Sequence, residues 1–232
     1  EVGAIYQRDD SVQNGPLSVA GYAQPKRVAA MAYGAVADEQ WGQASRTVDF
    51  FDVKADLEAL FAPLVLRFTK AEHPALHPGR SANVELDGKV IGFIGELHPR
   101  WMQKYDLPLA PVLFEVDAAA LTQRVVPAYQ EISKFPGASR DLAVVVKQSV
   151  AVQDLLDSFH VAAKASPAAR IVQAIVLFDE YRGKGLETDE KSLAFRISLQ
   201  DTQNTLQDDV VDGLMAVLID AAKQGHDAKL RS

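Results

Sequence analysis

A regular succession of strand and helix patterns in residues 133–232 most strongly constrains the fold of this chain. Between Ser192 and Leu199, apolar side chains alternate with small or polar ones, which predicts a strand with one buried face. Apolar runs at 142–146 and 171–178 predict two more strands, and residues 228–230 predict a short last one. Helical spacing at about 152–164 and after residue 205 completes the order βαββαβ. This order predicts a ferredoxin-like domain.

Polar residues mark the expected starts of the two helices. Ser149 is expected to cap the first helix, and Thr205 followed by Asp208 resembles a capping box for the second. A loop that contains Gly183 and Gly185 joins the second and third strands.

The first part of the chain has the pattern of a separate module built on an antiparallel sheet. Apolar residues at helical spacing predict a helix over 49–66, with Asp49 or Asp52 at its acidic start. Asp87-Gly88 predicts a tight hairpin between two apolar runs, and Pro99 predicts the start of a short helix. The expected fold class is therefore α+β, with a module at 1–125, a linker at 126–132 and the ferredoxin-like domain at 133–232.

Charge and composition exclude several classes of protein. The net charge of -7, from 24 basic and 31 acidic residues, argues against binding nucleic acid by bulk electrostatics, so any RNA contact needs a local patch. Cysteine is absent, which excludes disulfides and thiol nucleophiles and favours a reducing, cytoplasmic location. No apolar run is long enough to span a bilayer. The chain opens at Glu1 without a signal, which we interpret as a fragment of a longer protein.

The sequence contains no combination of residues typical of catalysis or metal binding. His73 and His77 have the spacing of paired metal ligands on a helix, but Pro74 and Pro78 argue against a continuous helix there. His98 before Pro99 is expected to begin a helix rather than to act as a base. No nucleophile is paired with a base. We therefore expect no catalytic residue, no metal site and no cofactor in this chain.

A ferredoxin-like sheet with both helices on one side leaves its other face free. Such a face can bind unpaired bases through aromatic stacking and short polar groups. The same fold also serves as a scaffold for protein contacts or as a sensor of small metabolites. Fold order alone leaves these alternatives open.

Short motifs carry a more specific resemblance to one family. In the second half, they are similar to the anticodon-binding domain of the bacterial phenylalanyl-tRNA synthetase β subunit, at residues 133–136, 140–146, 177–185, 191–194, 200–202 and 205–206. In the first half, they resemble the catalytic-like module of the same subunit, at residues 49–58, 77–82 and 91–99.

The resemblance implies a class II synthetase-like antiparallel module without the chemistry, followed by the anticodon-binding domain. The family's enzyme is an (αβ)2 heterotetramer that uses ATP and magnesium to join phenylalanine to tRNA(Phe), with its active site on the α subunit. The partners implied for this chain are therefore tRNA(Phe) and an α subunit. The sequence has neither a Gly-x-Gly-x-x-Arg segment nor a Gly-x-x-x-x-Gly-Lys loop, which fits a chain that contributes no catalytic residue.

Two residues are the leading candidates for base recognition. In the family, a tyrosine at the place of Tyr181 stacks on the first base of the anticodon, and the position of Ser192 contributes to the same contact. A hydroxyl can both donate to and accept from a base edge. The structural alternatives are a tyrosine that covers the rim of the core and a solvated strand serine.

Four cations complete the expected RNA-binding set. Arg182, Lys184 and Arg196 are expected to neutralise phosphates, although acidic residues at 187, 189 and 190 dilute this patch. Arg140 is the fourth candidate, with a structural salt bridge to Asp141 as the alternative.

Overall fold

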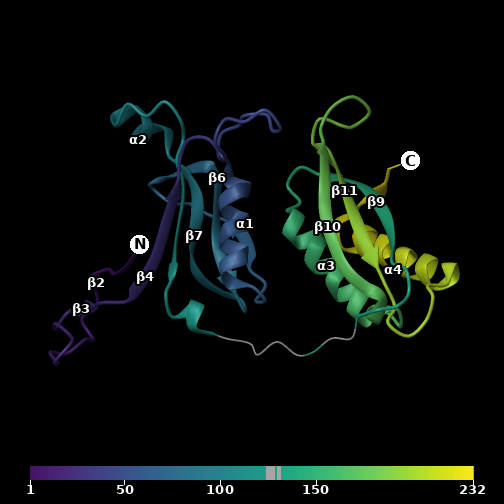
Figure 1. The fold of residues 1–232 in the computed structure, drawn as a ribbon, viewed down its shortest axis with the longest axis horizontal. Helices are drawn as coiled ribbons and strands as arrows, with labels where there is room; N and C mark the ends of the chain where they lie inside the picture. The colour runs from purple at the N-terminus through teal and green to yellow at the C-terminus, as the bar shows by residue number, and fades with distance from the viewer. Residues whose placement is uncertain (124–128, 130–131, 232) are drawn as a thin grey trace. The chain divides into compact units, whose positions relative to one another are not determined.

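The computed structural model describes residues 1–123, 129 and 132–231. It divides into two compact units, residues 1–127 and 128–232 (Figure 1). The linker expected at 126–132 falls mostly outside the described residues. Of that segment, only Tyr129 and Ile132 are described, and both side chains are exposed.

The first unit is a six-stranded antiparallel sheet in the order β1-β4-β8-β7-β6-β5, with helix α1 on one face (Figure 1). A two-stranded ribbon, β2–β3, precedes the longer strands. The elements of this unit are β1 Val2–Ala4, β2 Gln7–Arg8, β3 Tyr22–Ala23, β4 Lys26–Ala32, α1 Phe50–Phe61, β5 Arg67–Lys70, β6 Leu76–Leu86, β7 Lys89–Leu97, α2 Pro99–Lys104, β8 Val112–Asp117 and the 3-10 turn η1 Ala120–Thr122.

Helix α1 follows from its cap and its apolar stripe. Asp49 accepts hydrogen bonds from the backbone of Phe51 and Asp52, and the Asp52 side chain accepts in return from the backbone of Asp49. The helix buries Val53, Leu57 and Phe61 at four-residue spacing. It ends at Phe61, earlier than the predicted 66, because Pro63 disfavours helical backbone in the residue before it.

The hairpin between β6 and β7 has the predicted turn. Asp87 and Gly88 both have positive φ, at 50° and 75°, as a two-residue turn with the twist of the flanking strands requires. Further along β7, Gly92 lies so close to β8 that a Cβ there would be 2.0 Å from the carbonyl oxygen of Glu115. The sheet therefore needs glycine at this position.

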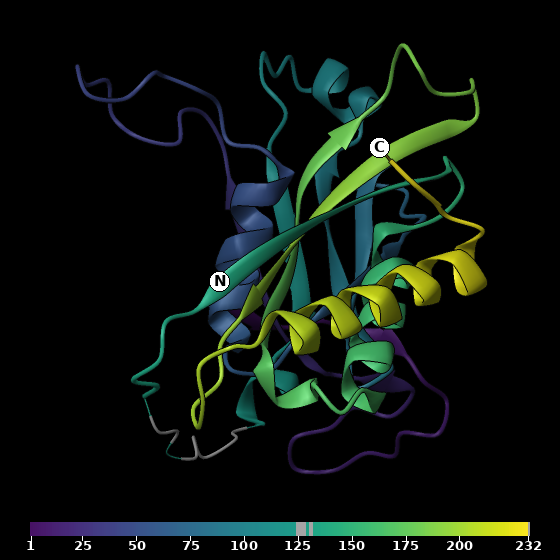
Figure 2. The same ribbon diagram turned by 90° about the vertical axis from the view of Figure 1, so that its right-hand side faces the viewer.

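The second unit has the expected order βαββαβ, with a four-stranded antiparallel sheet arranged β10-β11-β9-β12. Figure 2 shows α3 and α4 lying together along this sheet, and their buried residues share one core. The elements are β9 Ala138–Lys147, α3 Val152–Ala165, the 3-10 turn η2 Ala169–Ile171, β10 Val172–Tyr181, β11 Glu190–Leu199, α4 Asp208–His226 and β12 Lys229–Leu230.

One face of this sheet forms the core with the helices. In β11, Leu193, Phe195, Ile197 and Leu199 are almost completely buried, as the alternation predicted. The rings of Phe195 and Phe159 meet edge to face, with centroids 5.1 Å apart. The residues that alternate with these four buried residues in β11 point to the opposite face of the sheet, which the helices do not cover.

The two predicted helix caps in this unit are wrong. Helix α3 has Ala151 as its N-cap residue and no side-chain cap, because a turn from Lys147 to Val150 places Ser149 ahead of the helix. Helix α4 has Gln207 at its N-cap, also without a side-chain cap. Asp208 is its first helical residue, so it stabilises the helix through the dipole rather than through a capping box.

Among the helices of the described residues, none combines the length and apolar character needed to cross a membrane.

Candidate nucleic-acid interface

The sheet face opposite α3 and α4, here called the open face, collects the central candidate residues. Strand register decides which side chains share it, because residues directly opposite in a ladder point to the same side. Ser192 pairs with Tyr181 on β10 and with Val145 on β9. By the same alternation, the open face also includes Val176, Ala194, Arg196, Ser198, Asp141, Ala143 and Lys229.

Tyr181 and Ser192 are therefore direct cross-strand neighbours on one face. The Tyr181 ring is partly exposed and lies away from the core that the helices cover. Ser192 is only 3% exposed, which rules out the alternative that it is an ordinary solvent-exposed strand serine. Its hydroxyl forms no hydrogen bond with any residue that the structure describes. A nearly buried hydroxyl with unused hydrogen-bonding capacity is suited to contact a polar ligand.

Arg231 is part of this site, and the sequence prediction missed it. Its guanidinium carbon lies 4.7 Å from the centroid of the Tyr181 ring, as a cation–π contact. The backbone N–H of Arg231 donates to the carbonyl of Ala143, which holds the C-terminal segment on β9. Figures 1 and 2 show this C-terminal end near the loop that joins β10 and β11. The alternation of the last strand could have indicated Arg231, because it places residue 231 on the same side of the sheet as Lys229.

The loop between β10 and β11 contacts the same ring. The Tyr181 hydroxyl donates to the backbone carbonyl of Lys184 at 3.3 Å. Gly183, with φ of 157°, lies so close that a Cβ there would be 2.8 Å from that hydroxyl. Lys184 itself is exposed, and its ammonium has no ion pair among the described residues.

Two ion pairs flank Ser192 and Tyr181 at this end of the open face. Lys229 donates to Glu190 at 2.9 Å, which lowers the pKa of this buried carboxylate and raises the pKa of Lys229. Lys147 pairs with Asp189 at 2.8 Å, with the same directions of pKa shift. These acidic residues thus neutralise Lys147 and Lys229, and not the candidate cations Arg182, Lys184 and Arg196 that they were expected to weaken.

Arg196 is also paired. Its Nε and Nη2 each donate to one oxygen of Asp141 at 2.8 Å, and this fork lowers the pKa of Asp141. Its guanidinium carbon lies 4.8 Å from the centroid of the Phe178 ring. Phe178 is 50% exposed and lies at an irregularity in the β10–β11 ladder.

The remaining two cations lie elsewhere. Arg182 pairs with Glu180, whose ladder partner Leu193 points into the core. Arg140 pairs in register with Ile197, so it lies on the helix side, where its guanidinium is 3.5 Å from Asp208 at the start of α4. The alternative bridge from Arg140 to Asp141 does not form, because neighbours along a strand point to opposite faces.

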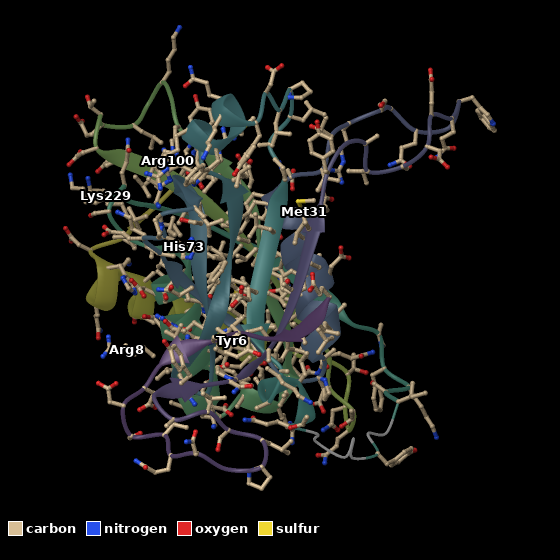
Figure 3. All side chains as sticks on the ribbon, turned by 90° about the vertical axis from the view of Figure 1, so that its left-hand side faces the viewer. Tyr6, Arg8, Met31, His73, Arg100 and Lys229 are labelled. Carbon is tan, nitrogen blue, oxygen red and sulfur yellow. The ribbon has the colours of Figure 1, made fainter. Side chains whose placement is uncertain are left out.

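The first unit also exposes one sheet face, which Figure 3 shows with His73 and Met31 labelled. His73 stacks on Phe93 with ring centroids 4.2 Å apart, and His77 Nδ1 accepts from the backbone of Gly79. No group of three or more His, Asp or Glu residues in the described part of the chain is arranged to hold a metal ion. His98 caps α2 by accepting from Arg100, which confirms its predicted role at the helix start.

Comparison with known protein families gives the class of the second unit and then the family of the chain. Residues 133–231 match the ferredoxin-fold anticodon binding domain, so this unit is of the anticodon-binding class. Residues 1–118 match the phenylalanyl tRNA synthetase beta chain CLM domain. The chain belongs to the family of phenylalanyl-tRNA synthetase β chains.

Individual relatives agree with this assignment. The chain is 56% identical over its whole length to the phenylalanine-tRNA ligase beta subunits of Ralstonia nicotianae and Burkholderia pseudomallei. It is 50% identical to that of Dechloromonas aromatica. The chain spans 28–29% of the length of these relatives. The alternative of a scaffold or metabolite sensor unrelated to RNA is not favoured by these matches.

Proposed function

We propose that the open face of the second unit binds the anticodon end of tRNA(Phe), as part of a phenylalanine-tRNA ligase. Tyr181 provides the ring on which one unpaired base stacks, and Ser192 contacts the edge of that base. The observation that carries this proposal is the direct cross-strand pairing of the two residues, together with the unused hydroxyl of Ser192.

Arg231 covers one face of the Tyr181 ring, and a base that stacks on this face displaces its guanidinium. An exposed cation–π contact contributes about 0.5–1 kcal/mol, whereas a base stacked on an aromatic side chain contributes about 1–3 kcal/mol. The exchange is therefore favourable. Once displaced, the guanidinium remains beside the bound nucleotide and can contact its phosphate.

The charges predict shallow dependence on salt. Of the proposed cations, Arg182 and Arg196 are paired with carboxylates, and Arg140 is on the helix side. Lys184 and Arg231 remain as the cations near Tyr181 without a carboxylate partner among the described residues. Two phosphate contacts to a single strand correspond to a slope of about -1.4 in log K against log salt.

The first unit has a supporting role in this proposal. Its antiparallel sheet with one covering helix suits a class II synthetase-like module that contacts an α subunit, in an (αβ)2 enzyme located in the cytoplasm. ATP and magnesium serve the whole enzyme, whose active site lies on the α subunit. The chain thus contributes binding energy that positions the tRNA while its 3′ end reacts elsewhere.

Binding of the 232-residue chain to tRNA(Phe) tests the proposal. Filter binding over a range of salt concentrations should give weak affinity with the shallow slope derived above. A tRNA(Phe) transcript with substituted anticodon bases is the matched control and should bind more weakly. Equal affinity for the two transcripts would refute recognition of the anticodon.

A further inference from the structure

We infer that Phe178 forms a second base-stacking site on the open face, and that Arg196 and Asp141 hold its ring in position. This inference rests on the proposed function, because it concerns the same RNA and the same sheet. It assigns Arg196 a different role from the phosphate contact that the sequence predicted.

The geometry of three neighbouring strands supports this assignment. Phe178 on β10 is 50% exposed, although an apolar ring of this size is usually buried. The guanidinium of Arg196 on β11 packs against it at 4.8 Å. Asp141 on β9 fixes that guanidinium through two hydrogen bonds of 2.8 Å. The ring is therefore held from one side while about half of its surface stays open.

Pairing with Asp141 argues against a phosphate contact by Arg196. The Arg196–Asp141 pair has no net charge, so it attracts a phosphate less strongly than an unpaired guanidinium would. The Asp141 carboxylate, which is exposed on the same face, would also repel one. The pair is thus suited to positioning the ring rather than to neutralising the RNA backbone.

The spacing of the two rings decides whether the two bound bases can be stacked on each other. Phe178 is the extra residue at the irregularity in β10, so it lies between two and three residue steps from Tyr181 along the sheet, or about 7–10 Å. Stacked neighbours along one nucleic-acid strand are only about 3.4 Å apart. The two rings therefore take two bases that are not stacked on each other, as in a splayed loop. Val176, which is 55% exposed and directly opposite Arg196, extends the apolar surface beside Phe178.

Fluorescence of 2-aminopurine tests this inference on the 232-residue chain. The probe is an anticodon stem–loop RNA of tRNA(Phe) with 2-aminopurine at one loop position at a time. Stacking on a protein ring changes the emission of the stacked position. We expect two positions to respond, one sensitive to Tyr181→Ala and the other to Phe178→Leu, which keeps an apolar side chain but removes the ring.

Affinity separates the direct and the positioning roles. Phe178→Leu should weaken binding of the stem–loop about tenfold, whereas Phe178→Trp should retain it. Arg196→Lys should reduce the second fluorescence response while leaving the salt slope unchanged. Asp141→Asn should also reduce this response, but it should steepen the salt slope, because it leaves Arg196 without its carboxylate partner. If Arg196 instead contacted a phosphate, Arg196→Lys would retain binding and Asp141→Asn would tighten it.

The outcomes also distinguish this inference from the proposed function. A single responding position, sensitive to Tyr181→Ala and unaffected by Phe178→Leu, would overturn the second site and leave the anticodon-binding proposal intact. The absence of any binding to the stem–loop would count against both. Circular dichroism of each variant serves as the control for folding.

Discussion

Replacing Tyr181 by alanine tests the exchange of Arg231 for a base. The variant loses the stacked base, worth about 1–3 kcal/mol, but it no longer has to displace a cation–π contact worth about 0.5–1 kcal/mol. With the middle of each range, about 2 and about 0.75 kcal/mol, the difference is about 1.25 kcal/mol, which corresponds to roughly eightfold weaker binding of tRNA(Phe). Because Tyr181 lies outside the core, the unfolding midpoint should change little.

Fluorescence anisotropy with labelled tRNA(Phe) at one fixed salt concentration measures this effect. The matched control is Tyr181→Phe, which keeps the ring and removes only the long hydrogen bond to the carbonyl of Lys184. That control should bind within about threefold of the unmodified chain. Equal affinity of the alanine variant and the unmodified chain would refute the stacking argument, since no base would then depend on the ring.

Three further predictions concern stability and its dependence on pH. Phe159→Ala removes a fully buried ring and should destabilise the second unit by about 3–5 kcal/mol, measured by urea unfolding with circular dichroism; a loss below about 1 kcal/mol would contradict the packing. Gly92→Ala forces a clash with β8 and should lower the free energy of unfolding of the first unit by at least about 2 kcal/mol. Tryptophan fluorescence measures this unfolding, because both tryptophans lie in the first unit. Gly3→Ala, at an exposed glycine, is the control and should leave the stability nearly unchanged. Arg46 lowers the pKa of Asp52 to about 2, so the stabilisation lost in Asp52→Asn should be fully present above about pH 4 and should decline as the pH falls through 2. A difference of the same size at about pH 2 and at about pH 5 would contradict this.

Local periodicity predicted much of the fold, because burial on one face leaves a direct record in the sequence. The alternation in Ser192–Leu199 correctly separated core from open face, and Asp87-Gly88 correctly located a hairpin. The caps at Ser149 and Thr205 were wrong because a turn of a few residues decides which side chain reaches the first helical N–H groups. Propensity alone does not resolve such turns.

The candidate site was only partly predictable for a different reason. Tyr181 and Ser192 follow from a motif within two adjacent strands, so the sequence brings them close together. The partners of Arg196 and Tyr181 come from strands distant in the chain, namely Asp141 on β9 and Arg231 beyond β12. These pairings depend on the register of the folded sheet, which the local sequence around each residue does not contain.

The most direct test of the central proposal is a map of the RNA-binding face. In an NMR titration of the 232-residue chain with the anticodon stem–loop of tRNA(Phe), signals from Tyr181, Ser192 and Arg231 should shift in a saturable way. Signals from the exposed sides of α3 and α4 should stay in place. Shifts confined to the helices, with the open face unperturbed, would contradict the account.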